Sequence, residues 1–220
     1  TKDGKEIWQF KTEKSFIKSQ KKLSLLIVDE KIFFNNSIGD ISAVDIENGN
    51  MIWQKPTQAN IGYEGSFSLK TSDLIASEDL ILFSNNKNEF YSLDIKTGFL
   101  NWKQKINSNL RPTLVGDLIF TITLEGFLVV INKNDGNIIR STDIFKKLSK
   151  KRRDKIKPIG FIVGFDKIYL TTSNGRLFVI DILTGRTLSV LKIDNKKISR
   201  PFVLNQNLFI IEENSIIKLN

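Results

Sequence analysis

Short stretches in which apolar and polar residues alternate occur along the whole chain. Examples are DISAVD, which ends at Asp45, EFYSLD, which ends at Asp94, and GRLFVID, which ends at Asp181. Alternation over five or six residues, bounded by Gly, Asn and Asp, is typical of β-strands joined by hairpin turns. A turn at Thr1 to Gly4 followed by a strand at Lys5 to Phe10 fits the same pattern. No segment has a sustained 3.6-residue apolar period, so the pattern predicts an all-β protein.

A glycine returns in the same context after each alternating stretch. The segments are TKDGKEIW, DIENGNMIW, DIKTGFLNW, NKNDGNIIR and DILTGRTLS, and their glycines are Gly4, Gly49, Gly98, Gly136 and Gly185. A period near 45 residues is too long for one hairpin and fits a four-stranded propeller blade. The sequence therefore predicts one β-propeller domain over residues 1–220, with four continuous blades and one blade split between the two ends. The predicted repeats are approximately 1–10 plus 200–220, 24–57, 72–106, 111–145 and 157–194.

The residues around each glycine have a structural explanation. An Asp or Asn four positions earlier can accept backbone hydrogen bonds within the turn, and glycine permits positive φ. Four residues after the glycine stand Trp8, Trp53 and Trp102, which we interpret as rings buried against the next blade. The alternative is a cofactor platform or a sugar-stacking surface. Arg140 and Ser189 replace tryptophan in the later repeats.

Composition removes several classes of enzyme. The chain of 220 residues has no cysteine and no histidine, so it lacks thiolate metal ligands, the cysteine nucleophile and the commonest general base. We expect no metal and no cofactor. No apolar run approaches the roughly 18 residues that a membrane-spanning helix requires. The opening inside a turn predicts that earlier blades are missing.

A net charge of +9 points to an anionic neighbour. The densest basic run is FKKLSKKRRDKIK, residues 145–157, which includes Lys150, Lys151, Arg152 and Arg153. Runs of like charge are usually solvated loops, and contact with anionic lipid headgroups or with an acidic partner is the alternative. We expect no nucleic acid, because the run lacks interleaved aromatic residues.

The repeat carries a family resemblance. NGRLFVIDILTG and DIKTGFLNW resemble the PQQ-like (quinoprotein-type) β-propeller repeat, and longer stretches such as GDISAVDIENGNMIWQ are similar to the later blades of the BamB family. That resemblance implies an eight-bladed propeller, of which about three blades are absent here. It also implies a periplasmic, lipid-anchored scaffold at the outer membrane, which docks on a POTRA domain of the barrel-insertase subunit and helps to assemble β-barrel proteins.

PQQ-dependent dehydrogenases share the repeat and provide the alternative. Their sites use a disulfide between adjacent cysteines, calcium ligands and a catalytic aspartate. This chain has no cysteine, and Asp45, Asp94 and Asp181 lie at predicted turns. We therefore expect a scaffold without catalytic residues, while a dehydrogenase fragment or another PQQ-like binding module remains the alternative.

The resemblance also suggests a partner-binding stretch, Phe16, Ile17 and Lys18. The corresponding loop of the family carries a leucine-and-arginine stretch, and Ile17 with Lys18 keeps its apolar-then-basic order. Lysine loses the bidentate geometry of arginine. Of the acidic pair that the family has nearby, only Asp73 is present here. The alternative is an ordinary loop whose apolar side chains pack against the blades.

Overall fold

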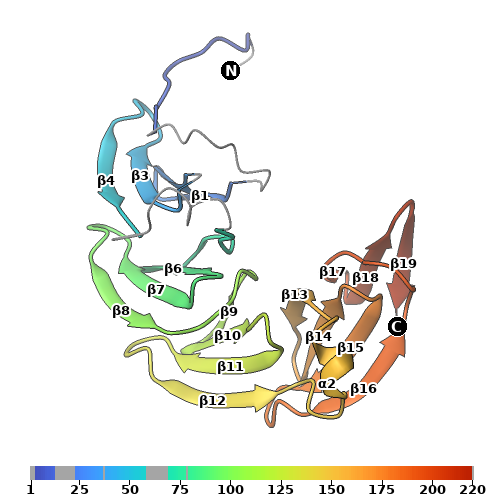
Figure 1. Ribbon diagram of the computed structural model, residues 1–220. Helices are drawn as coiled ribbons and strands as arrows, with labels where there is room; N and C mark the ends of the chain where they lie inside the picture. Colours follow the sequence, from blue (N-terminus) through green and yellow to red (C-terminus); the bar gives the residue numbers. More distant parts are fainter. Residues whose placement is uncertain (1–2, 13–22, 37, 58–68, 78, 220) are drawn as a thin grey trace.

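The computed structural model describes residues 3–12, 23–36, 38–57, 69–77 and 79–219. Within these residues, five antiparallel sheets follow one another along the chain (Figure 1), four with four strands and the last with three. One short helix, α2 (Lys150–Arg153), lies between the third and fourth sheets. This arrangement confirms the predicted all-β class and its four-stranded units.

The strands of each sheet pair in sequence order. Sheet 1 contains β1 (Leu25–Val28), β2 (Lys31–Asn35), β3 (Ile41–Asp45) and β4 (Met51–Lys55). Sheet 2 contains β5 (Ile75–Ala76), β6 (Leu80–Asn85), β7 (Glu89–Asp94) and β8 (Leu100–Gln104). Sheet 3 contains β9 (Thr113–Val115), β10 (Leu118–Ile122), β11 (Phe127–Asn132) and β12 (Ile138–Asp143). Sheet 4 contains β13 (Pro158–Val163), β14 (Lys167–Thr172), β15 (Arg176–Asp181) and β16 (Thr187–Lys192). Sheet 5 contains β17 (Phe202–Leu204), β18 (Asn207–Glu212) and β19 (Ser215–Leu219).

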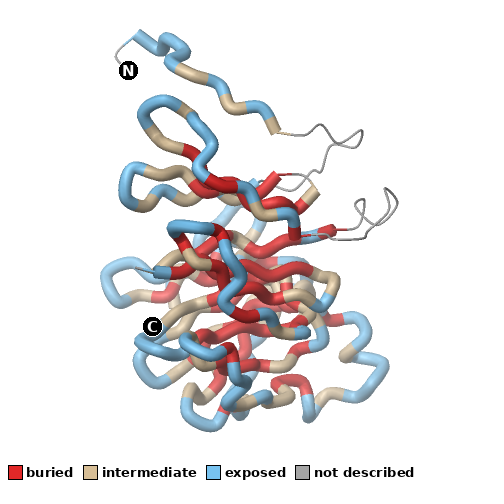
Figure 2. The backbone as a smooth tube through the Cα atoms, turned by 90° about the vertical axis from the view of Figure 1, so that its left-hand side faces the viewer, coloured by how far each residue is buried: buried red, intermediate tan, exposed pale blue. Residues whose placement is uncertain are grey.

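Pairing in sequence order gives every sheet two different ends. The first and third hairpins of a sheet turn at one end, which we call the turn face. The second hairpin and the connection to the next sheet lie at the other end, which we call the connection face. Figure 2 shows the buried strands running between two rims of exposed loops.

The five sheets follow an arc, with the first strand of each sheet on the concave side and the fourth strand of sheets 1–4 on the convex side (Figure 1). The apolar core lies between neighbouring sheets. One cluster packs Phe33 and Trp53 of sheet 1 against Phe83 of sheet 2, and three more clusters join sheets 2 and 3, 3 and 4, and 4 and 5. Central strands are covered on both faces, and all six residues of β6 are buried. Outer strands such as β8 bury only their tryptophan.

Two expectations about the chain ends have different outcomes. The strand predicted at Lys5 to Phe10 is wrong: residues 3–12 form no strand, because none of the described strands pairs with them. Instead, the Phe10 ring packs edge-on against Phe34 of β2, with 5.8 Å between the ring centroids. Segment 3–12 and sheet 5 lie at opposite ends of the arc (Figure 1), and the split blade stays a prediction. Among the described helices, none has the length and apolarity needed to cross a membrane.

Candidate functional site

Trp53 and Trp102 lie in the seams between successive sheets, and Trp8 of segment 3–12 lies against sheet 1, all at the turn face. Each indole N–H donates to the carbonyl of the residue that follows a turn-opening Asp or Asn. These bonds join Trp8 to Ile46 at 3.0 Å, Trp53 to Ile95 at 3.2 Å and Trp102 to Lys133 at 2.9 Å. The polar atom of each ring is therefore already used within the fold.

The faces of the same rings are covered by the turn glycines. A Cβ atom at Gly49, Gly98 or Gly136 would lie 2.5–2.6 Å from the ring of Trp8, Trp53 or Trp102. All three glycines have φ near +70°. Trp53 and Trp102 are each only 9% exposed, so neither offers a stacking platform. Only glycine allows this close approach with positive φ.

The acidic residues at the turns also have structural roles. Asp94 Oδ1 accepts hydrogen bonds from the backbone N–H groups of Lys96 and Thr97 and from the Thr97 hydroxyl, at 2.7–3.0 Å. These bonds, the Thr97 hydroxyl first, hold the pKa of Asp94 below its usual value. The Thr184 hydroxyl and backbone N–H lower the pKa of Asp181 in the same way. A carboxylate stabilised in its charged form as a turn acceptor is poorly suited to act as a general acid.

Arg140 takes the place of tryptophan in the seam between sheets 3 and 4. Its register matches that of Trp102, since each lies opposite the residue before a β-bulge. Its guanidinium donates to the carbonyl of Ile182 at 2.8 Å and to that of Leu183. The Ile182 carbonyl is the counterpart of the acceptors in the tryptophan seams, so this seam keeps the hydrogen bond and loses the ring.

Among the described groups, Tyr91 has a strongly raised pKa. It is buried on β7, its hydroxyl donates to the Thr57 carbonyl at 3.0 Å, and burial raises its pKa to about 12. The Lys103 ammonium lies 4.9 Å from the ring centroid and 2.8 Å from the Glu89 carboxylate. The cluster ties β7 to β8 and to the connection that follows β4, which is a structural role.

The basic run is only partly a solvated loop. Ile144, Phe145 and Ile156 are buried between sheets 3 and 4, and the Phe145 ring lies 5.2 Å from that of Phe178. Arg153 forms a two-pronged ion pair with Asp143, at 2.8 and 3.1 Å. Arg153 therefore holds the insertion to the end of β12.

Lys150, Lys151 and Arg152 are the exposed members of the predicted basic set. They lie on α2, at the connection face. Contact of these three with an anionic surface stays a prediction, whereas Arg153 already has an acidic partner.

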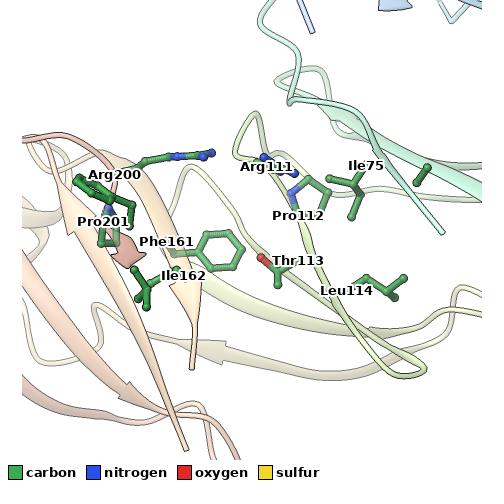
Figure 3. Close-up of a pocket in the computed structure, with 12 residues that line it drawn as sticks. Ile75, Arg111, Pro112, Thr113, Leu114, Phe161, Ile162, Arg200 and Pro201 are labelled. Atoms are coloured by element: carbon green, nitrogen blue, oxygen red, sulfur yellow. The ribbon is translucent and has the colours of Figure 1, made fainter. Parts of the chain in front are cut away.

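A pocket opens on the concave side of the arc, near the connection face (Figure 3). Its volume is about 470 Å³, and a smaller hollow of about 110 Å³ adjoins it. Arg111 and Arg200 line both, and Phe161 forms part of the wall. The Arg200 side chain extends across the pocket toward Arg111, above the Phe161 ring (Figure 3). Arg200 lies 3.8 Å from Asp73, the acidic residue noted in the sequence.

Sequence reasoning missed this pocket, although a signal was present. RPTLV and RPFVL each begin with an Arg-Pro pair directly before a predicted first strand. Aligning the first strands of the blades, and not only their last turns, would have placed Arg111 and Arg200 at equivalent positions. Phe16, Ile17 and Lys18, the predicted partner stretch, lie outside the described residues.

Within residues 3–12, 23–36, 38–57, 69–77 and 79–219, no three acidic side chains gather in a way that could hold a metal ion. The connection face instead combines cations, apolar side chains and a pocket. That combination suits binding of another molecule.

Comparison with known protein families identifies the family of this chain. Residues 1–142 match the model of the family described as outer membrane protein assembly factor BamB. No curated protein sequence matches the chain.

Solved structures with similar folds include the following three, one of which is described as a β-propeller domain. BamB from Moraxella catarrhalis superposes with a TM-score of 0.77 at 14% identity over 96% of this chain. The computationally designed Ika8 protein gives 0.65 at 12% identity over 91% of the chain. The Cps50 (Swd1) β-propeller domain of Myceliophteria thermophila gives 0.65 at 13% identity over 92%. The chain spans 62%, 58% and 65% of these three structures, respectively. These likenesses confirm the predicted propeller fold.

Proposed function

The chain belongs to the family of outer membrane protein assembly factor BamB, and on that premise we propose that it is a non-catalytic propeller that holds a protein partner. The family match over residues 1–142 is the observation that carries the proposal. The partner is a POTRA domain of the barrel-insertase subunit, and the setting is the periplasmic side of the outer membrane. In this role the propeller is a rigid support whose loops make the contacts.

The connection face is the docking surface in this proposal. Among the described residues, its features are the exposed cations of α2 and the pocket beside Arg111 and Arg200. The predicted stretch at residues 16–18 is the proposed contact. Phe16, Ile17 and Lys18 belong, by their place in the sequence, to the connection between segment 3–12 and β1. Apolar anchors accompanied by a cation are a common composition for the few side chains that dominate a protein interface.

A double substitution tests the surface. Ile17→Ala with Lys18→Ala is expected to weaken binding to a purified POTRA-domain protein at least tenfold, which corresponds to about 1.4 kcal/mol. Calorimetric titration measures the affinity, and the melting temperature is expected to remain that of the wild type.

The turn face offers a matched control. Phe165 is 103% exposed on the turn between β13 and β14, and Lys167 begins β14. Phe165→Ala with Lys167→Ala also removes one apolar side chain and one lysine, and it is expected to leave binding unchanged. Equal losses in both double variants would place docking away from residues 16–18. Absence of binding by the wild-type chain would contradict the proposed partner.

Catalysis has its own test. Titration with pyrroloquinoline quinone, followed by absorbance, is expected to give no saturable complex. A stoichiometric complex would favour the dehydrogenase alternative.

A further inference from the structure

We propose that Arg111 and Arg200 form a binding site for a carboxylate carried on an apolar group, in the pocket on the concave side of the arc. The proposal does not depend on the predicted docking stretch at residues 16–18. Its ligand is either a free organic acid or the carboxyl end of a peptide, which share the same chemistry.

The repeat brings the two arginines together. Each stands directly before a buried proline, Pro112 or Pro201, at the start of the first strand of its sheet. In both sheets the first hairpin closes three residues after that proline, with Val115 opposite Leu118 and Leu204 opposite Asn207. Equivalent positions on the innermost strands of a propeller lie at the same level along the central axis and face that axis. The two side chains consequently converge on one pocket from sheets 3 and 5 (Figure 3).

The same register position in sheets 2 and 4 is held by Asp73 and Gly160, and both line the smaller hollow beside the arginines. Gly160 allows a close approach, because a Cβ atom there would lie 2.2 Å from Cβ of Arg200. An alanine at this position would force the backbone around Arg200 away. The absence of a side chain in sheet 4 thus lets Arg200 reach over the pocket.

The charges at the site do not balance. Asp73 offsets one arginine, but its carboxylate lies 3.8 Å from the Arg200 guanidinium, beyond hydrogen-bond distance. No ion pair of Arg111 is found with any residue that the structure describes. One positive charge therefore remains, and a single carboxylate would neutralise it.

The pocket wall selects the kind of anion. Arginine presents a planar fork of N–H donors that matches a carboxylate in two-pronged geometry. Phe161, Ile75 and Phe202 supply apolar surface beside that fork. Placing a strongly hydrated inorganic anion against such a wall costs solvation, whereas an apolar group attached to a carboxylate gains by contact. A volume near 470 Å³ lies within the usual range of small-ligand pockets, about 300–1,000 Å³.

Two pairs of probes test the proposal on the 220-residue chain. Phenylacetate is compared with phenylacetamide, and the peptide N-acetyl-Gly-Gly-Leu with its carboxyl-terminal amide, by calorimetric titration. We expect each acid to bind at least tenfold more tightly than its amide. The acid with the higher affinity identifies the source of the natural ligand. Equal binding of acid and amide, or tighter binding of inorganic phosphate, would overturn the proposal.

Variants assign the binding to these residues. Arg111→Gln and Arg200→Gln are each expected to weaken the acids at least fivefold, because each removes one charged donor. Arg186→Gln, at an exposed arginine on the turn between β15 and β16, is the matched control and is expected to change nothing. Asp73→Asn is expected to strengthen binding, since it removes the competing carboxylate. Unchanged affinity in Arg111→Gln, or weaker binding in Asp73→Asn, would contradict the proposal. All four positions are at least partly exposed, so the variants are expected to fold, as melting curves would verify.

Discussion

The seam between sheets 2 and 3 and the seam between sheets 3 and 4 each contain an aromatic ring packed on a glycine, but at opposite ends of the sheets. In the first, the Trp102 ring covers Gly136 at the turn face. In the second, Arg140 supplies the hydrogen bond at the turn face, and no ring lies on Gly185, whose nearest neighbour is the Thr142 side chain. A ring returns at the connection face, where a Cβ atom at Gly126 would lie 2.2 Å from Phe145.

Comparison of the two seams separates two structural roles that tryptophan combines. One is donation of a hydrogen bond to a carbonyl exposed by the turn, and the other is coverage of a glycine with a large apolar ring. In the seam between sheets 3 and 4, Arg140 provides the first, and Phe145 of the basic insertion provides the second by covering Gly126 of sheet 3. The insertion is therefore part of the core as well as a carrier of charge.

Truncation of the rings tests these separate roles and is expected to change stability most. Trp102→Ala and Phe145→Ala are each expected to lower the free energy of unfolding by about 3–5 kcal/mol, as loss of a buried aromatic side chain does. Chemical denaturation measures the change. Phe165→Ala, at a fully exposed ring, is the control and is expected to cost no more than about 0.5 kcal/mol. A Phe145 variant that resembled the Phe165 control would show that the second seam does not depend on a ring.

Substituting the glycines under the rings is expected to have the next largest effect. Gly136→Ala and Gly126→Ala each combine positive φ with a clash against a ring, for a total of about 2–4 kcal/mol. Gly116→Ala has positive φ but open space around the added atom, so about 1 kcal/mol is expected. Chemical denaturation measures how much more Gly136→Ala and Gly126→Ala destabilise the fold than Gly116→Ala does. That difference is the cost of the steric clash with the rings. Equal costs at all three glycines would mean that the rings move away without penalty.

Acid sensitivity gives the smallest expected difference between the seams. The turn that receives Trp102 opens with Asn132, which does not titrate, whereas the turn that receives Arg140 opens with Asp181. The Thr184 hydrogen bonds and, to a lesser extent, the Arg140 charge lower the pKa of Asp181 below its usual value. A group with a lowered pKa in the folded state stabilises it above the unfolded pKa, and this contribution is lost as the pH falls through the folded value.

Reciprocal substitutions expose that difference. Asp181→Asn is expected to reduce the loss of stability between pH 4 and pH 2, and Asn132→Asp is expected to increase it. Thermal melting across this pH range provides the measurement. Identical acid profiles for wild type and both variants would indicate that the turn carboxylate makes no contribution to folding.

The repeated turn could be predicted from the sequence because its chemistry is local. Asp94, Gly98 and Trp102 stand at fixed spacings, and each spacing has a physical reason that needs no knowledge of distant residues. The strand expected at Lys5 to Phe10 failed because a strand requires a partner, and the described strands offer it none.

The functional surface was less predictable because its members come from different sheets. Arg111 and Arg200 are far apart in sequence and meet only when the arc is formed. The ion pair of Arg153 with Asp143 likewise depends on how the insertion folds back on β12. A run of charge in the sequence does not reveal which member is already neutralised.

The placement of the core between sheets also has a consequence for cooperativity. In arrays whose units contact only their neighbours, unfolding behaves as a one-dimensional chain of coupled steps, and the weakest junction opens first. The cluster joining sheets 3 and 4 contains thirteen buried residues, whereas the one joining sheets 4 and 5 contains four. In this chain, β17–β19 should therefore detach in a sub-global opening while the other sheets stay folded, and their amide hydrogens should exchange with solvent at the lowest free energy.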